Sequence, residues 1–155
     1  MNQPITRRTA IIGLAASAAF PTAGIAQSSE VWSVGDAHNA LQKDLIRMID
    51  VRSRQEWTDI GVAEGAWAIS LHEERFSERL FAARELASGR KVALICATGG
   101  RSGSVMRSLR QAGYDGFIDV SEGMLGSAQG SGWIAAGLPI VEVEAALAAL
   151  PDTLA

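Results

Sequence analysis

The chain has 155 residues, of which 48% are hydrophobic, and a formal net charge of −3 at pH 7. No run of lysine or arginine forms a basic patch, so nucleic acid is not an expected partner. The only two histidines lie far apart, and with a single cysteine they have no spacing typical of a metal site. We therefore expect neither a metal nor another cofactor.

The amino-terminal segment has the pattern of a cleavable export signal, which we keep out of the fold. Arg7 and Arg8 form a basic stretch, residues 11–20 are apolar and uncharged, and residues 24–26 include small side chains suited to a cleavage site. We predict cleavage after Ala26. The apolar stretch is shorter than the roughly 20 residues of a membrane-spanning helix, so we expect no stable membrane insertion after cleavage.

The export route is open between two alternatives. Thr6-Arg7-Arg8 resembles a twin-arginine signal, and a general secretory route fits the segment as well. Either route places the mature protein outside the cytoplasm, and we expect a periplasmic location. Residues 27–155 are then one domain with a core over about 31–141 and a helical carboxyl-terminal tail. Its net charge is about −5, because the leader carries two arginines and no acidic residue.

Beyond a lead-in at residues 27–33, which we expect to be mobile, apolar runs alternate with helical patterns. The apolar runs predict strands at 45–49, 66–71, 91–95 and 117–120. The helical patterns lie around His38 and at 54–60, 73–86, 102–112, 134–136 and 141–150. This alternation predicts an α/β domain with a mostly parallel central sheet flanked by helices on both faces.

Ligands of such sheets bind beyond the carboxyl ends of the strands. The corresponding positions here are residues 50–52, 70–72, 96 onward and 121–123. The stretch Cys96-Ala97-Thr98-Gly99-Gly100-Arg101-Ser102, named the cysteine loop below, therefore lies where a site is expected.

Cys96 falls between an apolar strand and a helical pattern, among free backbone N–H groups and at the positive end of a helix dipole. Both effects favour a thiolate, which suits a nucleophile. Gly99 and Gly100 allow the positive-φ conformations that turn amides inward, and Arg101 offers two parallel hydrogen bonds to an anion. The alternative is that Cys96 is only a small buried hydrophobe. An odd cysteine in an exported protein favours a reactive thiol or an intermolecular partner.

Three stretches resemble the rhodanese (sulfurtransferase) family, as a single-domain member. The first is 50–57 followed by 61–66, the second is the cysteine loop, and the third is 123–126 with Trp133 and 136–139. Together they span about Val31 to Val141 in the family's order.

The resemblance implies a sulfurtransferase that moves a sulfane sulfur through a persulfide on Cys96. The partners are a small anionic donor such as thiosulfate and an acceptor thiol or cyanide. Backbone amides would hold the persulfide, and Arg101 would steer the donor; these binding residues are Ala97, Thr98, Gly99, Gly100 and Arg101. Many thiosulfate-active members carry a basic residue where this chain has Ala97, so the identity of the donor stays open.

Two other functions remain as alternatives. One is a persulfide carrier, or a module that docks on another protein, with little turnover of its own. The other is a small phosphatase-like or arsenate-reducing enzyme. Related phosphatases place the arginine one residue later in the loop, where this chain has Ser102. The shorter loop fits the sulfur of a persulfide better than a phosphate.

Asp50, Arg52 and Glu56 invite a catalytic interpretation, but we expect an ion pair and a helix-start anchor. Arg52 also follows a strand end and is a candidate for the rim of the pocket. The remaining histidines and aromatic residues are interpreted as structural: His72 in a loop, His38 on the surface, and Trp57, Trp67 and Trp133 as core or pocket-wall packing.

Overall fold

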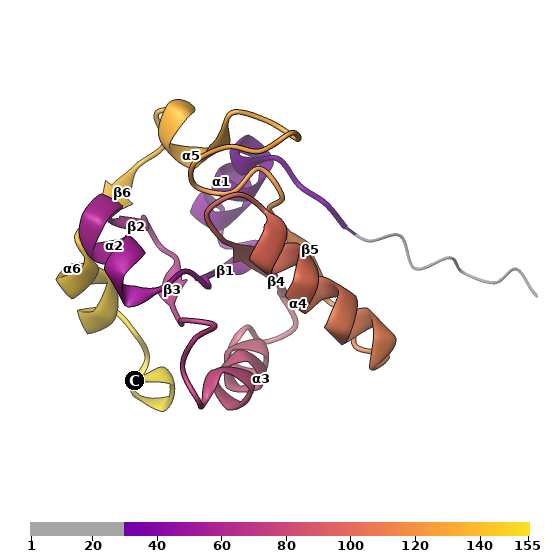
Figure 1. Ribbon diagram of the computed structural model, residues 1–155. Helices are drawn as coiled ribbons and strands as arrows, with labels where there is room; N and C mark the ends of the chain where they lie inside the picture. The colour runs from indigo at the N-terminus through magenta and orange to yellow at the C-terminus, as the bar shows by residue number, and fades with distance from the viewer. Residues whose placement is uncertain (1–29) are drawn as a thin grey trace, which may run out of the picture.

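A computed structural model describes residues 30–155 (Figure 1). The predicted leader and its cleavage point after Ala26 lie outside these residues. The elements in chain order are α1 (Val34–Gln42), β1 (Ile46–Asp50), α2 (Arg54–Ile60), β2 (Val62–Ala63), β3 (Trp67–Ala68), α3 (Phe76–Leu86), β4 (Lys91–Ile95), α4 (Gly100–Gln111), β5 (Phe117–Asp119), α5 (Gly132–Ala135), β6 (Ile140–Val141), α6 (Val143–Ala148) and the 3-10 helix η1 (Asp152–Leu154). Of the helices in the described range, none combines the length and the apolar character needed to cross a membrane.

The main sheet has four parallel strands in the order β3-β1-β4-β5. Its two central strands pair along their whole length, from Ile46 opposite Lys91 to Asp50 opposite Ile95. Because all four strands run in the same direction, their carboxyl ends meet at one edge, as the sequence predicts. A separate antiparallel pair joins β2 to β6, which the sequence analysis did not predict.

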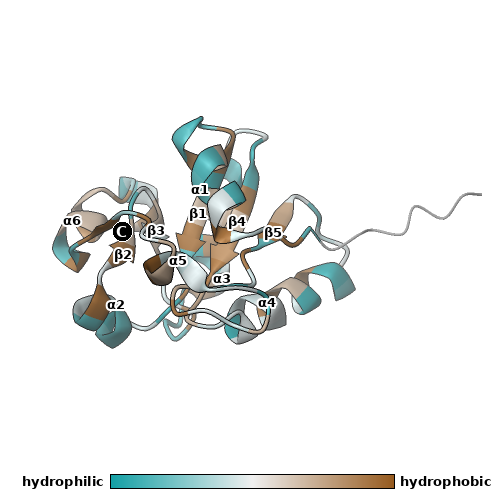
Figure 2. Ribbon diagram, turned by 90° about the horizontal axis from the view of Figure 1, so that it is seen from above, coloured by the Kyte–Doolittle hydropathy of each residue, from teal (hydrophilic) through white to brown (hydrophobic). Residues whose placement is uncertain are grey.

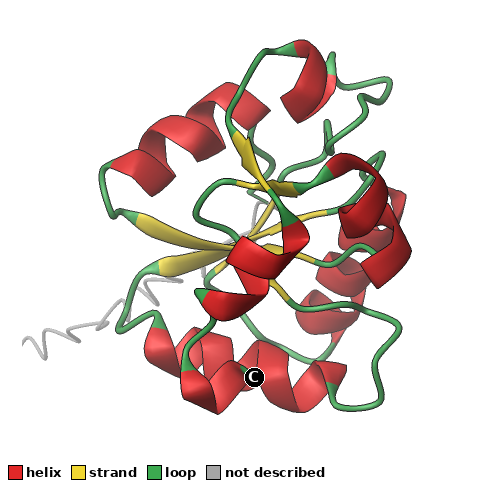
Figure 3. Ribbon diagram, turned by 90° about the vertical axis from the view of Figure 1, so that its left-hand side faces the viewer, coloured by secondary structure: helices red, strands yellow, loops and turns green. Residues whose placement is uncertain are grey.

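Helices cover both faces of the sheet (Figure 3). Met48 and Ile95 belong to one buried cluster, together with residues of α1, α5 and α6. Ile49 and Leu94 point to the opposite face, where they pack with residues of α3, α4 and η1. The strands between these layers are mainly apolar (Figure 2), as expected for a sheet buried on both faces, and their charged residues lie mostly at strand ends. The predicted α/β fold is confirmed.

Local signals explain where the first helices begin and end. Ser53 forms a capping box with Glu56 at the start of α2, and Gly61 closes that helix with φ +90°. Ser33 caps α1 by accepting a hydrogen bond from the amide of Asp36. These two serines thus fix the residue at which each helix begins.

The structure contradicts the mobility predicted for the described part of the lead-in. The amide of Trp32 donates to the carbonyl of Asp119, and the amide of Asp119 donates to the carbonyl of Glu30, each at 2.9 Å. Residues 30–32 therefore pair with β5 by backbone hydrogen bonds, and the prediction of mobility is wrong for them. The segment Glu30-Val31-Trp32 is too short to show a strand pattern, so this pairing could not be predicted from the sequence.

Candidate functional site

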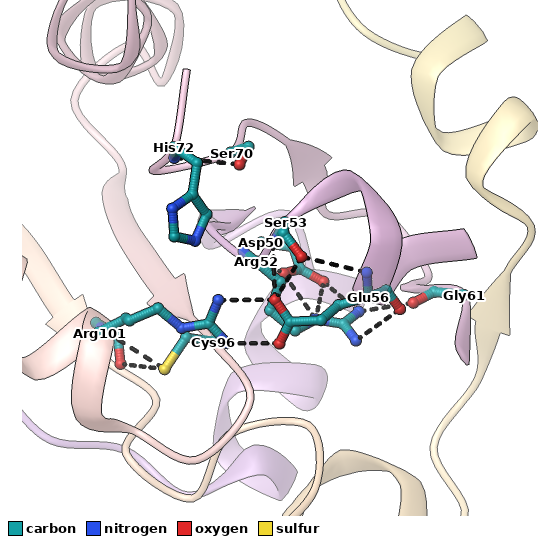
Figure 4. Close-up of polar contacts among 10 residues, drawn as sticks. Asp50, Arg52, Ser53, Glu56, Gly61, Ser70, His72, Cys96 and Arg101 are labelled. Atoms are coloured by element: carbon teal, nitrogen blue, oxygen red, sulfur yellow. Dashed lines mark hydrogen bonds and ion pairs between the residues drawn. The ribbon is translucent and has the colours of Figure 1, made fainter. Parts of the chain in front are cut away.

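Cys96 follows β4 directly, and α4 begins four residues later. Its side chain is fully buried at the carboxyl edge of the sheet. The sulfur lies 3.5 Å from the amide nitrogen of Ser102, which donates to it, and 3.5 Å from the Ser102 hydroxyl oxygen (Figure 4). The cysteine loop therefore curls around the sulfur and returns to it at Ser102.

The backbone of this loop is held through its carbonyl groups. The carbonyls of Cys96 and Ala97 accept hydrogen bonds from the amides of Met124 and Leu125, both at 2.8 Å. The amide N–H groups of residues 97–101 donate to no acceptor within residues 30–155. These amides stand at the start of a helix of 12 residues, whose dipole favours an anion there.

Two glycines allow the loop to pack backbone against backbone. Gly99 has φ +80°, and a Cβ atom built on it would lie 2.1 Å from the carbonyl oxygen of Ser121. Gly123 has φ +71°, and its Cβ would lie 2.4 Å from the carbonyl oxygen of Ala97. Gly100 is helical and faces open space, so the prediction that both loop glycines supply positive φ is right for Gly99 and wrong for Gly100.

Arg101 makes a two-pronged ion pair with Glu56 of α2. Its two terminal nitrogens donate to the two carboxylate oxygens at 2.7 and 2.5 Å. Glu56 also accepts from the amide and hydroxyl of Ser53 at 2.9 and 2.8 Å. The hydrogen bonds from Arg101 are the largest cause that lowers the pKa of Glu56 to about 2; Ser53 adds to the shift, and burial opposes it. The arginine expected to steer a donor is thus engaged by a carboxylate of its own chain.

Asp50 and Arg52 form the predicted ion pair, and both side chains are fully buried. The Nη2 of Arg52 donates to Asp50 at 2.7 Å and to the carbonyl of Gly61 at 2.6 Å, while its Nε donates to both oxygens of Asp50. The structure therefore places Arg52 inside the domain, where it ties β1 to the end of α2, and not at a pocket rim.

The histidines differ from each other in their surroundings. His72 is exposed in the loop after β3, as expected, and its amide donates to the Ser70 hydroxyl. His38 is half-buried, with its ring edge against Trp133 at 5.5 Å between ring centres, so the surface position predicted for it is wrong.

Trp57 and Trp133 are fully buried in the core, as predicted, and Trp67 is half-buried. Within residues 30–155 no group of three metal-ligating side chains occurs.

Two polar groups near the cysteine loop were not predicted as site residues, Ser102 beside the sulfur and Asp119 beside the first turn of α4. Ser102 is fully buried in the first turn of α4, and Asp119 is 9% exposed at the end of β5. Burial raises the pKa of Asp119, while the Ser102 hydroxyl, Arg110 and Arg107 act against that shift. Asp119 could have been found by its position, because it lies next to the end of the strand predicted at 117–120, at the same edge of the sheet as Cys96.

The domain is a parallel α/β fold whose single cysteine is buried at the start of a helix, next to backbone amides without acceptors in the described residues. These features define a class of proteins in which a cysteine loop binds an anion. Residues 33–128 match the rhodanese-like domain family, and the chain belongs to that family.

The chain is similar to a Synechocystis protein described as the uncharacterized protein slr1261, with 30% identity over 103 residues. The match covers 66% of this chain and 51% of that protein, so this chain spans about half the length of that relative. The rhodanese-like domain of the Anabaena protein Alr3790 is similar in structure, with a TM-score of 0.56 and 20% identity over 80% of this chain and 85% of that one. The crystal structure of Rv0390 from M. tuberculosis is also similar, with a TM-score of 0.50 and 24% sequence identity. That match covers 74% of this chain and 98% of the other. At these identities the two structures support the fold alone.

Proposed function

We propose that the protein is an exported sulfurtransferase that moves a sulfane sulfur through a persulfide on Cys96. The observation that carries this proposal is the buried Cys96 sulfur beside the unpaired amides of residues 97–101. A persulfide anion on Cys96 needs hydrogen-bond donors and has no need of a side-chain cation, and the loop supplies such donors from its backbone. Membership of the rhodanese-like family supports the same chemistry.

The transfer has two steps. The Cys96 thiolate attacks the outer sulfur of the donor; for thiosulfate the sulfur–sulfur bond breaks, and sulfite leaves with the electron pair. An acceptor thiolate or cyanide then attacks the outer sulfur of the persulfide, and Cys96 returns as a thiolate. Atoms and electrons balance without a cofactor.

The charges around the loop bear on the choice of donor. Ala97 carries no charge, and the guanidinium of Arg101 is paired with Glu56. Attraction of an anionic donor then rests mainly on the loop amides and the dipole of α4. We expect free thiosulfate to react, but with weaker binding than at a loop with an unpaired cation.

The proposal includes the location and extent of the mature protein. Removal of residues 1–26 would release a domain over 27–155 into the periplasm. A lone cysteine has no internal disulfide partner in that oxidising compartment, which suits a thiol kept for chemistry.

Intact-mass spectrometry of the mature protein before and after thiosulfate tests the chemistry. We expect a gain of one sulfur atom, its loss on adding cyanide, and no gain in Cys96→Ser. The Ser104→Ala variant is the matched control, because Ser104 is an exposed residue of the same helix. Sulfur transfer by Cys96→Ser, or a free thiol that takes no sulfur from thiosulfate, polysulfide or a protein persulfide, would overturn the proposal.

The carrier or docking alternative is favoured by one observation, the Arg101–Glu56 ion pair, which reduces the attraction for a small anion. Slow turnover with free thiosulfate together with rapid transfer to a protein thiol would support that alternative. Fast turnover with thiosulfate and cyanide would exclude it.

A further inference from the structure

Asp119 is a buried carboxyl group with no role in the transfer described above. It ends β5, is 9% exposed, and its Oδ1 has no hydrogen-bond partner within the described residues. The backbone of Asp119 already pairs with Glu30 and Trp32, so the side chain is not needed to hold that contact. A buried carboxylate oxygen without a hydrogen-bond partner lowers the stability of the folded state. We therefore expect this side chain to have a function.

The carboxyl group faces the first turn of α4, next to the cysteine loop. A Cβ atom built on Gly103 would lie 3.4 Å from its Oδ2. The Ser102 hydroxyl is close enough to this carboxyl group to lower its pKa, and in the structure it donates to the carbonyl of Gly99 at 3.3 Å. The same hydroxyl lies 3.5 Å from the Cys96 sulfur. Ser102 therefore contacts the thiol directly and lies beside the carboxyl group, so a turn of its hydroxyl away from Gly99 would join the two, and all three side chains are buried.

We propose that Asp119 is the acceptor of the Cys96 thiol proton, with the Ser102 hydroxyl as the relay. The S–H bond of Cys96 breaks as its proton joins the Ser102 oxygen, and the former hydroxyl proton moves to a carboxylate oxygen of Asp119. The products are a thiolate, an intact serine hydroxyl that donates to it, and a neutral carboxylic acid. No electron is gained or lost, and no other reactant is required.

The surroundings of Asp119 suit a proton acceptor. Burial raises the pKa of this carboxyl, so it takes a proton more readily than an exposed aspartate. The charges that act on it within the described chain are Arg110 and Arg107 of α4, which favour its ionised form before the proton arrives. Transfer of the proton also leaves a single negative charge in the buried site, where a thiolate beside a carboxylate would hold two.

The inference deepens the proposed function, but its test needs no sulfur donor. Cys96 is the only cysteine of the chain, so alkylation by iodoacetamide reports on its thiolate alone. We expect Asp119→Asn to slow alkylation about tenfold at pH 7 and to move the profile to higher pH, since an ordinary thiol is only a few per cent ionised there. Ser102→Ala should do the same, and the double variant should be no slower than either single variant.

Asp115→Asn is the matched control, because Asp115 is an exposed aspartate just before the same strand, and its profile should equal that of the wild type. An unchanged profile in folded Asp119→Asn would overturn the relay. So would an effect of Asp119→Asn that persists in full when Ser102 is already alanine.

A second measurement does not depend on whether the Asp119 variants fold. Infrared spectroscopy of the wild-type protein at neutral pH should show the carbonyl band of one buried protonated carboxyl group, shifted in heavy water. Cys96→Ser should lack this band, because its hydroxyl gives no proton to Asp119. Absence of the band in the wild type, or its persistence in Cys96→Ser, would refute the relay. The infrared and alkylation results do not depend on sulfur transfer, so they would stand even if the protein transferred no sulfur.

Discussion

Glu56 joins two sequence motifs that lie far apart in the chain. It caps α2 through Ser53 and holds the guanidinium of Arg101, 45 residues further on, with both carboxylate oxygens. A two-pronged arginine–carboxylate pair fixes direction as well as distance. Arg101 is thereby oriented by the first motif, and the cysteine loop is tied to α2.

This pair has a consequence for stability in acid. The folded pKa of Glu56 is about 2, below its ordinary value of 4.5, so the ionised form favours the folded state. That contribution is complete above pH 4.5 and is lost as the pH falls from 4.5 to 2. We expect Glu56→Gln to be less stable than the wild type at neutral pH and to show a flatter dependence of unfolding free energy on pH across this window.

Urea denaturation at a series of pH values measures this dependence. Glu85→Gln is the matched control, because Glu85 is an exposed glutamate of α3. Its curve should run parallel to that of the wild type. If Glu56→Gln kept the full wild-type slope between pH 4.5 and 2, the Arg101–Glu56 pair would contribute nothing to folding.

At this scale, prediction from sequence succeeded where partners are near in the chain. The ion pair predicted for Asp50 and Arg52 joins residues two apart, and the helix-start anchor predicted at Glu56 is formed with Ser53 within one helical turn. Arg101 and Glu56 meet only through tertiary structure, so the sequence pattern indicated an anionic donor as the partner of Arg101. Ser102 and Asp119 come together in the same way.

At the scale of elements, the turn from β4 into α4 depends on a close approach of two backbones. Gly99 has positive φ, and the carbonyl oxygen of Ser121 occupies the space of a side chain. Gly99→Ala therefore combines a strained conformation with a clash against backbone, and we expect a loss of at least about 1 kcal/mol in unfolding free energy. We also expect slower alkylation of Cys96 as the loop shifts.

Gly100→Ala is the matched control, one residue away. Gly100 is helical and has no atom within 4 Å of a built Cβ, so alanine should keep or raise stability by up to about 1 kcal/mol. Chemical denaturation of the two variants separates the cases. Equal stability of Gly99→Ala and Gly100→Ala would contradict the packing described for the loop.

Element prediction from periodicity was accurate within one residue for β1, β4 and β5, whereas the strand predicted at 66–71 is only Trp67–Ala68. β4 matched its expected range of 91–95, and α2 matched 54–60 with its closing Gly61. β2 and β6 have two residues each, too few to show any alternation, so only their pairing across the fold defines them. α3 starts at Phe76, three residues later than expected, because Glu73 first makes a turn on Ser70.

Over the whole molecule, the carboxyl-terminal segment closes one face of the sheet. Leu154 is fully buried in the cluster of α3 and α4, and its carbonyl accepts a hydrogen bond of 2.7 Å from Nε of Arg79. Arg79 is itself only 6% exposed and also pairs with Glu73. The end of the chain thus returns to α3, 75 residues earlier, and completes the core on the side of the sheet that carries Cys96.

We expect Arg79→Met to lower the free energy of unfolding by about 2 kcal/mol, since it removes charge-assisted hydrogen bonds and leaves a buried carbonyl without a donor. Arg75→Met is the matched control: Arg75 is exposed and within the described residues pairs only with Glu78, so its loss should cost much less than that of Arg79. Deletion of residues 151–155 should destabilise the wild type and reduce the cost of Arg79→Met, because the Leu154 carbonyl is then absent. Equal costs of Arg79→Met in the full and shortened chains would mean that Arg79 stabilises α3 without holding the carboxyl-terminal segment.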